Sequence, residues 1–98
     1  MPMVRLEVGG WLRERLDATG AHRGNFSVSI PEGETILGMA RQIAAQNDVF
    51  RKIVFKQEEL GANVLVILNG IFVNPQNRAE TLLKEGDEVM LLPVVDGG

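Results

Sequence analysis

The stretch VLVILNGIFV, residues 64–73, consists of two β-rich apolar runs joined by an Asn-Gly pair. Asn and Gly both accept the positive φ angles of a type I′ turn, so Asn-Gly between two such runs is the strongest short signal for a β-hairpin. The stretch therefore predicts antiparallel strands over residues 64–68 and 71–73. Pro75 ends the second strand, because proline cannot donate to a strand ladder.

Strand patterns also occur towards both ends of the chain. Residues 4–8 and 26–30 alternate between apolar and polar side chains, and a period of two predicts half-buried strands. Residues 88–92 form an apolar run between the turn residues Gly86-Asp87 and Pro93. Together with the hairpin, these segments predict a mixed sheet of four or five strands.

A helix is predicted over residues 35–46, where the period changes from two to nearly four. Thr35 is the candidate N-cap, because its hydroxyl can accept a hydrogen bond from an early backbone N–H. The helix should end near Gln46-Asn47. The apolar residues that form its stripe are Ile36, Leu37, Ala40, Ile43 and Ala44.

Two other segments have weaker patterns. Residues 11–16 predict a short helical turn with Trp11, Leu12 and Leu16 on its inner side. Residues 48–62 fit either another helical turn or an extended segment, and the sequence does not choose between them.

The predicted order is strand, strand, helix, strand, strand, strand. Two hairpins then flank one main helix that crosses one face of the sheet, which is the β-grasp arrangement of ubiquitin and an α+β fold. Residues 1–98 should form a single β-grasp domain with a flexible C-terminal tail, residues 94–98.

Two of the predicted strands, residues 64–68 and 89–92, are apolar at consecutive positions, so both of their faces are apolar. One long helix can cover only one face. Either residues 48–62 cover the second face, or part of that face docks a partner, since large apolar patches on soluble proteins usually mark such sites. The candidates for that partner surface are Phe72, Met90 and Leu92.

Composition excludes several classes of function. The 98 residues carry a net charge of −3 with one histidine and no cysteine. A nucleic-acid binder usually has a basic footprint, and the one compact basic group, Arg51, Lys52 and Lys56, is typical of a solvated face. His22 has no second imidazole or thiol to work with, so we predict no metal site and no catalytic role for it. No apolar run approaches a membrane span, and we expect a cytoplasmic protein.

The C-terminal third resembles a known family. Val66-Ile67-Leu68-Asn69-Gly70 is followed by Gly86-Asp87-Glu88-Val89, a tail containing Pro93, and the final pair Gly97-Gly98. This combination is similar to the ubiquitin-like sulfur carriers. They include the small subunit of molybdopterin synthase, the carriers of thiamine and cysteine synthesis, and archaeal small modifier proteins.

The resemblance implies a chemistry for the tail. An E1-like adenylating enzyme would use ATP to activate the Gly98 carboxylate as an acyl-adenylate, and a sulfur donor would convert it to a thiocarboxylate. A second enzyme, such as the large subunit of molybdopterin synthase, would accept the sulfur. The residues that thread the tail into these active sites would be Val94, Val95, Asp96 and Gly97. The chain itself would bind no cofactor and would be a carrier, or the small subunit of an enzyme complex, rather than an enzyme.

Two departures from the family pattern leave the pathway open. Val94 stands where molybdopterin-synthase small subunits commonly have a second proline, and Asp96 stands where a small residue is usual. Molybdopterin synthesis is the favoured branch, with thiamine or cysteine synthesis as alternatives. A ubiquitin-like modifier that joins target lysines through Gly98 needs the same tail, and so remains a second hypothesis.

Overall fold

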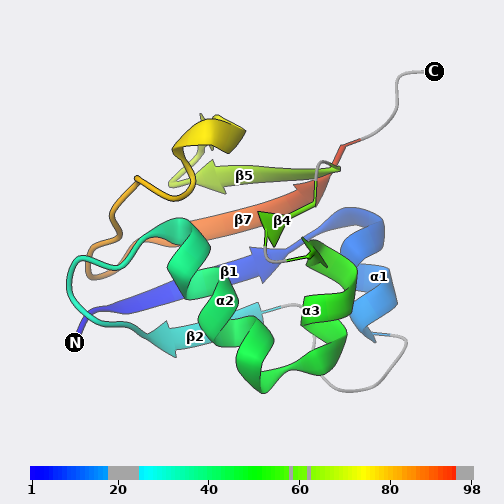
Figure 1. Ribbon diagram of the computed structural model, residues 1–98, viewed down its shortest axis with the longest axis horizontal. Coiled ribbons are helices and arrows are strands. Elements are labelled where there is room, and N and C mark those ends of the chain that lie inside the picture. The colour runs from blue at the N-terminus through cyan, green and yellow to red at the C-terminus, as the bar shows by residue number, and fades with distance from the viewer. Residues whose placement is uncertain (18–24, 58, 62, 95–98) are drawn as a thin grey trace.

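A five-stranded mixed sheet organises the residues that the computed structural model describes, 1–17, 25–57, 59–61 and 63–94. The strand order is β2-β1-β7-β5-β6, in which the neighbours β1 and β7 are parallel and the other pairs are antiparallel (Figure 1). The sheet confirms the expected α+β architecture. The strands are β1 (Met3–Val8), β2 (Asn25–Ser29), β5 (Val64–Leu68), β6 (Ile71–Val73) and β7 (Glu88–Pro93).

The turn between β5 and β6 has the predicted geometry. Asn69 has a φ of 49° and Gly70 a φ of 84°, as a type I′ turn requires. The Asn69 side chain also ties this turn to the start of β7. Its Nδ2 donates to Asp87 Oδ1 at 2.9 Å, and its Oδ1 accepts from the Glu88 N–H at 2.9 Å.

The helices α1 (Gly10–Asp17), α2 (Ile36–Gln46) and α3 (Asp48–Val54) lie on one side of the sheet (Figure 1). Thr35 caps α2 as predicted, because its Oγ1 accepts from the Gly38 N–H at 3.0 Å. Asn47 ends α2 and caps α3, accepting from the Phe50 N–H at 2.9 Å. The segment that the sequence left open is thus a helix, and a small hairpin of β3 (Phe55–Lys56) and β4 (Glu59–Leu60) follows it.

The core lies between these helices and the sheet. On β1 every second residue points into it, and Val4, Leu6 and Val8 are at most 1% exposed. Phe50 of α3 lies near the middle and meets the ring of Phe26 edge-on, at 5.3 Å between centroids. The core therefore requires α3 as well as α2.

Trp11 is one expectation that was wrong. Leu12 and Leu16, four residues apart on α1, are fully buried, whereas Trp11 is 37% exposed. One residue step turns a helix by about 100°, so Trp11 leaves the stripe that Leu12 and Leu16 define. Its ring instead lies beside the guanidinium of Arg15, with 5.8 Å between the Arg15 Cζ and the ring centroid.

Arg78 is the one buried charged residue among the described residues. The last residue pair between β5 and β6 is Val66 with Val73. Val64 lies beyond this pair, so β6 does not provide a hydrogen-bond partner for the Val64 carbonyl. The Arg78 Nη2 donates to this carbonyl, in place of a longer β6. Burial lowers the pKa of the Arg78 guanidinium. Arg78 follows the 3₁₀ turn η1 (Pro75–Asn77), which begins where Pro75 was expected to end the strand.

Candidate functional site

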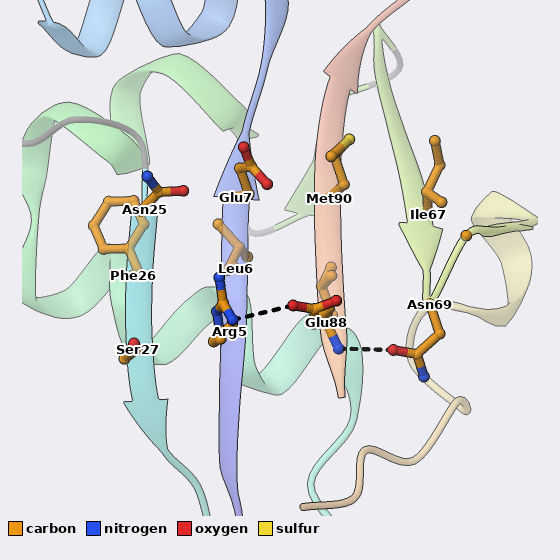
Figure 2. A pocket seen from close by; sticks show the side chains of 12 residues that line it. Arg5, Leu6, Glu7, Asn25, Phe26, Ser27, Ile67, Asn69, Glu88 and Met90 are labelled. Carbon is orange, nitrogen blue, oxygen red and sulfur yellow. Dashed lines mark hydrogen bonds and ion pairs between the residues drawn. The ribbon is translucent and has the colours of Figure 1, made fainter. Parts of the chain in front are cut away.

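The second face of the sheet has no helix on it among the described residues. One expected explanation for the apolar residues of this face was that residues 48–62 cover it. The described residues of that segment do not cover it. Phe50 and Val54 are fully buried in the core on the helix side, and α3 packs against α1 and α2. We call the uncovered side the open face; Figure 2 looks onto it, with the helices behind the strands.

Half of the open face is apolar. Leu65 of β5 lies opposite Leu92 of β7, and Ile67 lies between Met90 of β7 and Phe72 of β6. Phe72 is 51% exposed and the other four side chains are half-buried. Side chains opposite one another in a sheet touch, so these five form one continuous surface, the apolar patch. The structure thus places all three sequence candidates, Phe72, Met90 and Leu92, on one face.

The other half of the open face is polar. Arg5 of β1 and Glu88 of β7 are directly opposite and form an ion pair at 3.2 Å (Figure 2). Glu7, the next outward residue of β1, pairs with Arg13 of α1 at 3.8 Å. A groove of about 730 Å³ crosses the face from β2 to β5 and is lined by both halves, from Ser27 and Arg5 to Met90 and Ile67.

The start of the tail is held in place. The Val94 N–H donates to the Asn63 carbonyl at 2.7 Å, so the chain stays attached one residue past the end of β7. The corner between β1 and α1 packs against this point. A Cβ at Gly9 would lie 2.7 Å from Leu92 Cδ2, and one at Gly10, where φ is 62°, would lie 2.8 Å from the Pro93 ring. We call Leu92–Val94 the tail root.

The tail root adjoins the apolar patch, because Leu92 belongs to both. A partner that docks on the patch therefore sits next to the point from which the tail leaves the sheet. Of the predicted threading residues, Val94 is half-buried in the root. Val95, Asp96, Gly97 and Gly98 lie outside the described residues, as does His22.

The basic group that the sequence assigned to a solvated face is exposed, and part of it is paired. Arg51 and Lys52 both bind the Asp48 carboxylate in the first turn of α3. These hydrogen bonds lower the pKa of the Asp48 carboxyl. Over the described residues, no cluster of His, Asp and Glu side chains is arranged to hold a metal, and no helix is long and apolar enough to cross a membrane.

A family model described as the ThiS family matches residues 9–98. The chain belongs to the ThiS family. This confirms the resemblance to the ubiquitin-like sulfur carriers that the C-terminal third indicated. The match begins at Gly9, in the corner that packs against the tail root, and runs through Gly97 and Gly98. No curated protein matches the sequence.

Solved structures confirm the β-grasp fold. SAMP1 from Haloferax volcanii superposes with a TM-score of 0.78 at 20% identity, covering 98% of this chain and 99% of that one. A putative molybdopterin converting factor subunit 1 from Pyrococcus furiosus gives 0.71 at 22% identity, covering 97% and 100%. The structure of the BexX/CysO complex from Amycolatopsis orientalis gives 0.67 at 26% identity, covering 97% and 99%.

Four residues of this site, Leu65, Ile67, Gly9 and Gly10, were not predicted from the sequence. Ile67 could have been found, because a two-residue hairpin loop fixes the register and places Ile67 opposite Phe72. Leu65 then follows on the same face. The role of Gly9 and Gly10 had no local signal, since their contacts with Leu92 and Pro93 come from the other end of the chain.

Proposed function

We propose that this chain is a sulfur carrier whose Gly98 carboxylate is adenylated and converted to a thiocarboxylate, and that its sulfur serves molybdopterin synthesis for molybdenum or tungsten cofactors. The observation that carries the proposal is the ThiS-family match through Gly97 and Gly98, on a chain whose tail root adjoins an open apolar patch. In this proposal the apolar patch docks on the partner enzyme, the tail root fixes where the tail begins, and the tail reaches the partner's active site.

The length of the tail limits that reach. An extended chain advances about 3.3–3.6 Å per residue, so residues 95–98 span at most roughly 14 Å. The adenylating site of the partner must then lie within that distance of Val94 once the patch is docked. A root held by Asn63, Gly9 and Gly10 makes the distance reproducible. Such control matters, because a misplacement of about 1 Å can cost a factor of roughly 10² in rate.

The chemistry needs activation because a free carboxylate is a poor electrophile. In the proposed first step a Gly98 carboxylate oxygen attacks the α-phosphorus of ATP, and pyrophosphate leaves. The acyl-adenylate then has AMP as a good leaving group. Hydrosulfide released by the donor attacks the acyl carbon, a C–S bond forms, and the C–O bond to AMP breaks. Gly97 and Gly98 have no Cβ, so their backbone can approach a nucleotide phosphate closely. In this scheme the partner enzyme supplies the ATP site, and this chain supplies only the carboxylate.

The proposed partners are an E1-like adenylating enzyme and a sulfur-accepting enzyme such as the molybdopterin synthase large subunit. The similar CysO structure was solved as a complex with BexX, which supports a protein partner for this chain. Asp96 adds a requirement: a carboxylate beside the tail repels phosphate, so the partner should present a cation there.

The test is a reconstitution followed by mass spectrometry. With ATP, the cognate adenylating enzyme and a sulfur donor, the protein should gain the mass of one oxygen-to-sulfur exchange at Gly98. Deleting Gly98 should abolish the gain, whereas His22→Ala should leave it unchanged. Sulfur at another position, or a full gain without Gly98, would overturn the proposal. Lysine-linked conjugates formed through Gly98 in place of the thiocarboxylate would show that the chain is a modifier.

A further inference from the structure

The two edge strands of the described sheet differ in how they are protected. β6 is three residues long, and the chain turns away from the sheet at Pro75. β2 is five residues long, pairs with β1 without a bulge, and contains neither a charged residue nor a proline. Natural proteins usually protect an exposed edge with a short strand, a bulge, a charged residue or a proline, because an open edge is a template for another strand. On its outer side β2 has no paired strand among the described residues.

The hydrogen bonds of β2 fix which backbone groups face outward. The Ile30 N–H donates to the Pro2 carbonyl at 2.9 Å, on the β1 side. Backbone direction alternates along an antiparallel strand, so Val28 and Phe26 also turn their N–H and C=O groups toward β1. The residues that turn these groups outward are Asn25, Ser27 and Ser29.

One contact from α2 agrees with this assignment. The Gln42 Nε2 donates to the Ser29 carbonyl at 2.8 Å, from outside the sheet. A carbonyl oxygen has two lone pairs, so Ser29 can still accept a second hydrogen bond. Within the part of the chain that the structure describes, the outward groups of Asn25 and Ser27, and the Ser29 N–H, have no such hydrogen bond.

A groove of about 420 Å³ runs along the same edge, between β2 and α2. Its apolar lining comes from Phe26 and Val28, which are half-buried, and from Ile43. Gln42 and Gln46 of α2 add amide groups and no charge. An added strand would therefore form backbone hydrogen bonds at the edge, while its helix-side side chains entered an uncharged groove that is lined by apolar side chains and by amide groups.

We infer that the strand this edge accepts is β2 of a second copy of the chain, in an antiparallel pair with a two-fold axis at Ser27. In this register the two Ser27 residues exchange N–H to C=O hydrogen bonds. Each Ser29 N–H donates to the Asn25 carbonyl of the other copy. Phe26 then lies opposite Val28 of the other copy, in the closer, non-hydrogen-bonded type of pair.

The self-complementarity of β2 favours a second copy over an unrelated strand. Aromatic and β-branched side chains are a favourable cross-strand pair, and the two-fold axis forms the Phe26–Val28 pair twice. Like charges directly opposite one another destabilise a sheet, and the two-fold axis places Ser27 opposite itself and the other residues of β2 opposite residues of the same strand. β2 avoids this cost because its sequence, NFSVS, is uncharged.

The pairing is compatible with docking on the open face. β1 separates β2 from β7, and β5 and β6 lie further away. Pairing through the free edge of β2 therefore leaves the apolar patch and the tail root uncovered, and the dimer presents both tails. The inference does not rest on the proposed sulfur chemistry, and either can fail without the other.

The first measurement combines sedimentation equilibrium with amide hydrogen exchange, each from micromolar to millimolar protein. The protein should pass from monomer to dimer as concentration rises. The amides of Ser27 and Ser29 should gain protection with the dimer, whereas those of Phe26 and Val28 should be protected throughout. A monomer at every concentration, or a dimer whose new protection lies in another strand, would overturn the inference.

The second measurement places a negative or a positive charge at the two-fold axis. Ser27→Glu and Ser27→Lys should each raise the dimer dissociation constant roughly tenfold or more, because like charges then face each other. An equimolar mixture of the two variants should dimerise again as the mixed pair. Gln76→Glu adds the same negative charge near the opposite edge and should leave dimerisation unchanged. Circular dichroism checks that each variant is folded. Dimers that persist in both single variants, or no recovery in the mixture, would overturn the inference.

Discussion

Neighbouring residues of β5 and β7 are chemically alike and yet lie in opposite environments. Val66 and Leu91 are completely buried, while the residues next to them, Ile67 and Leu92, are only half-buried. The difference arises because the helices that pack on the described sheet all lie on one side. Burial in the core explains the apolar residues of the helix side. It does not explain those of the open face, which fit a surface that another protein covers.

The open face also differs between its two halves. The strands near the tail root, β5, β6 and β7, supply the apolar patch. β2 supplies serine and asparagine, and Arg5 of β1 forms an ion pair with Glu88 at the start of β7. Apolar side chains therefore gather where a partner would have to sit to receive the tail. The free edge of β2, with its uncharged strand, lies across the sheet from them.

The largest expected effect is a difference in the free energy of unfolding between substitutions on the two faces of the sheet. Leu91→Ala should lower the free energy of unfolding by about 2–5 kcal/mol, since it removes a fully buried side chain and leaves a cavity. Met90→Ala, one residue earlier on the open face, should cost about 1 kcal/mol, because its side chain is already partly in water. Urea unfolding of both variants measures the difference. Equal losses would mean that the open face is ordinary core.

The second prediction compares how substitutions on the two faces change the affinity for the adenylating enzyme. Phe72→Asp should weaken the complex with the adenylating enzyme roughly 30-fold, as expected for loss of an aromatic anchor worth about 2 kcal/mol. Ile71→Asp is the matched control, because Ile71 is the adjacent residue, is 71% exposed and points to the other face. Titration calorimetry with both folded variants gives the two dissociation constants. A similar loss for both would assign the effect to charge near β6 rather than to the apolar patch.

A third variant tests whether the polar end of the open face is structural. Asn69→Ala should lower the free energy of unfolding by about 1–3 kcal/mol, because it removes the hydrogen bonds to Asp87 and Glu88 and strains a backbone with a φ of 49°. Asn69→Gly removes the same hydrogen bonds but tolerates that φ, so it should cost less. Affinity for the partner should stay unchanged in both. A loss of binding with no loss of stability would move the docking surface to this end.

The sequence predicted the elements whose pattern is local. The hairpin of residues 64–73 and the capped helix after Thr35 carry their signals within a few neighbouring residues, and both are present as expected. Residues 48–54 could not be assigned, because a helix of that length shows barely two turns of periodicity. Trp11 was placed inward because a large aromatic residue next to a leucine looks like core, although the four-residue spacing of Leu12 and Leu16 already leaves it off their stripe.

The candidate site was predictable in part. Phe72, Met90 and Leu92 were found as apolar residues without a cover, but their common face depends on the pairing of β5 with β7, which joins distant segments. The contact of Gly10 with the Pro93 ring likewise joins segments that are distant in the sequence. The role of Gly98 came from the family resemblance alone, because a terminal glycine has no side chain from which a role could be inferred.

The smallest expected effect concerns the ion pair in the polar half of the open face. Glu88→Gln should change the free energy of unfolding by less than about 0.5 kcal/mol, although Arg5 and Glu88 lie only 3.2 Å apart. Their side chains are 73% and 62% exposed, so water and salt screen the attraction, and holding two long side chains together costs entropy. The Glu88 N–H keeps its bond to Asn69 in the variant. A double-mutant cycle with Arg5→Gln, at low and high salt, isolates the coupling energy of the pair. A coupling above about 1 kcal/mol that salt does not reduce would show that the polar half is held as firmly as the helix side, and the contrast between the two faces would then apply only to the apolar patch.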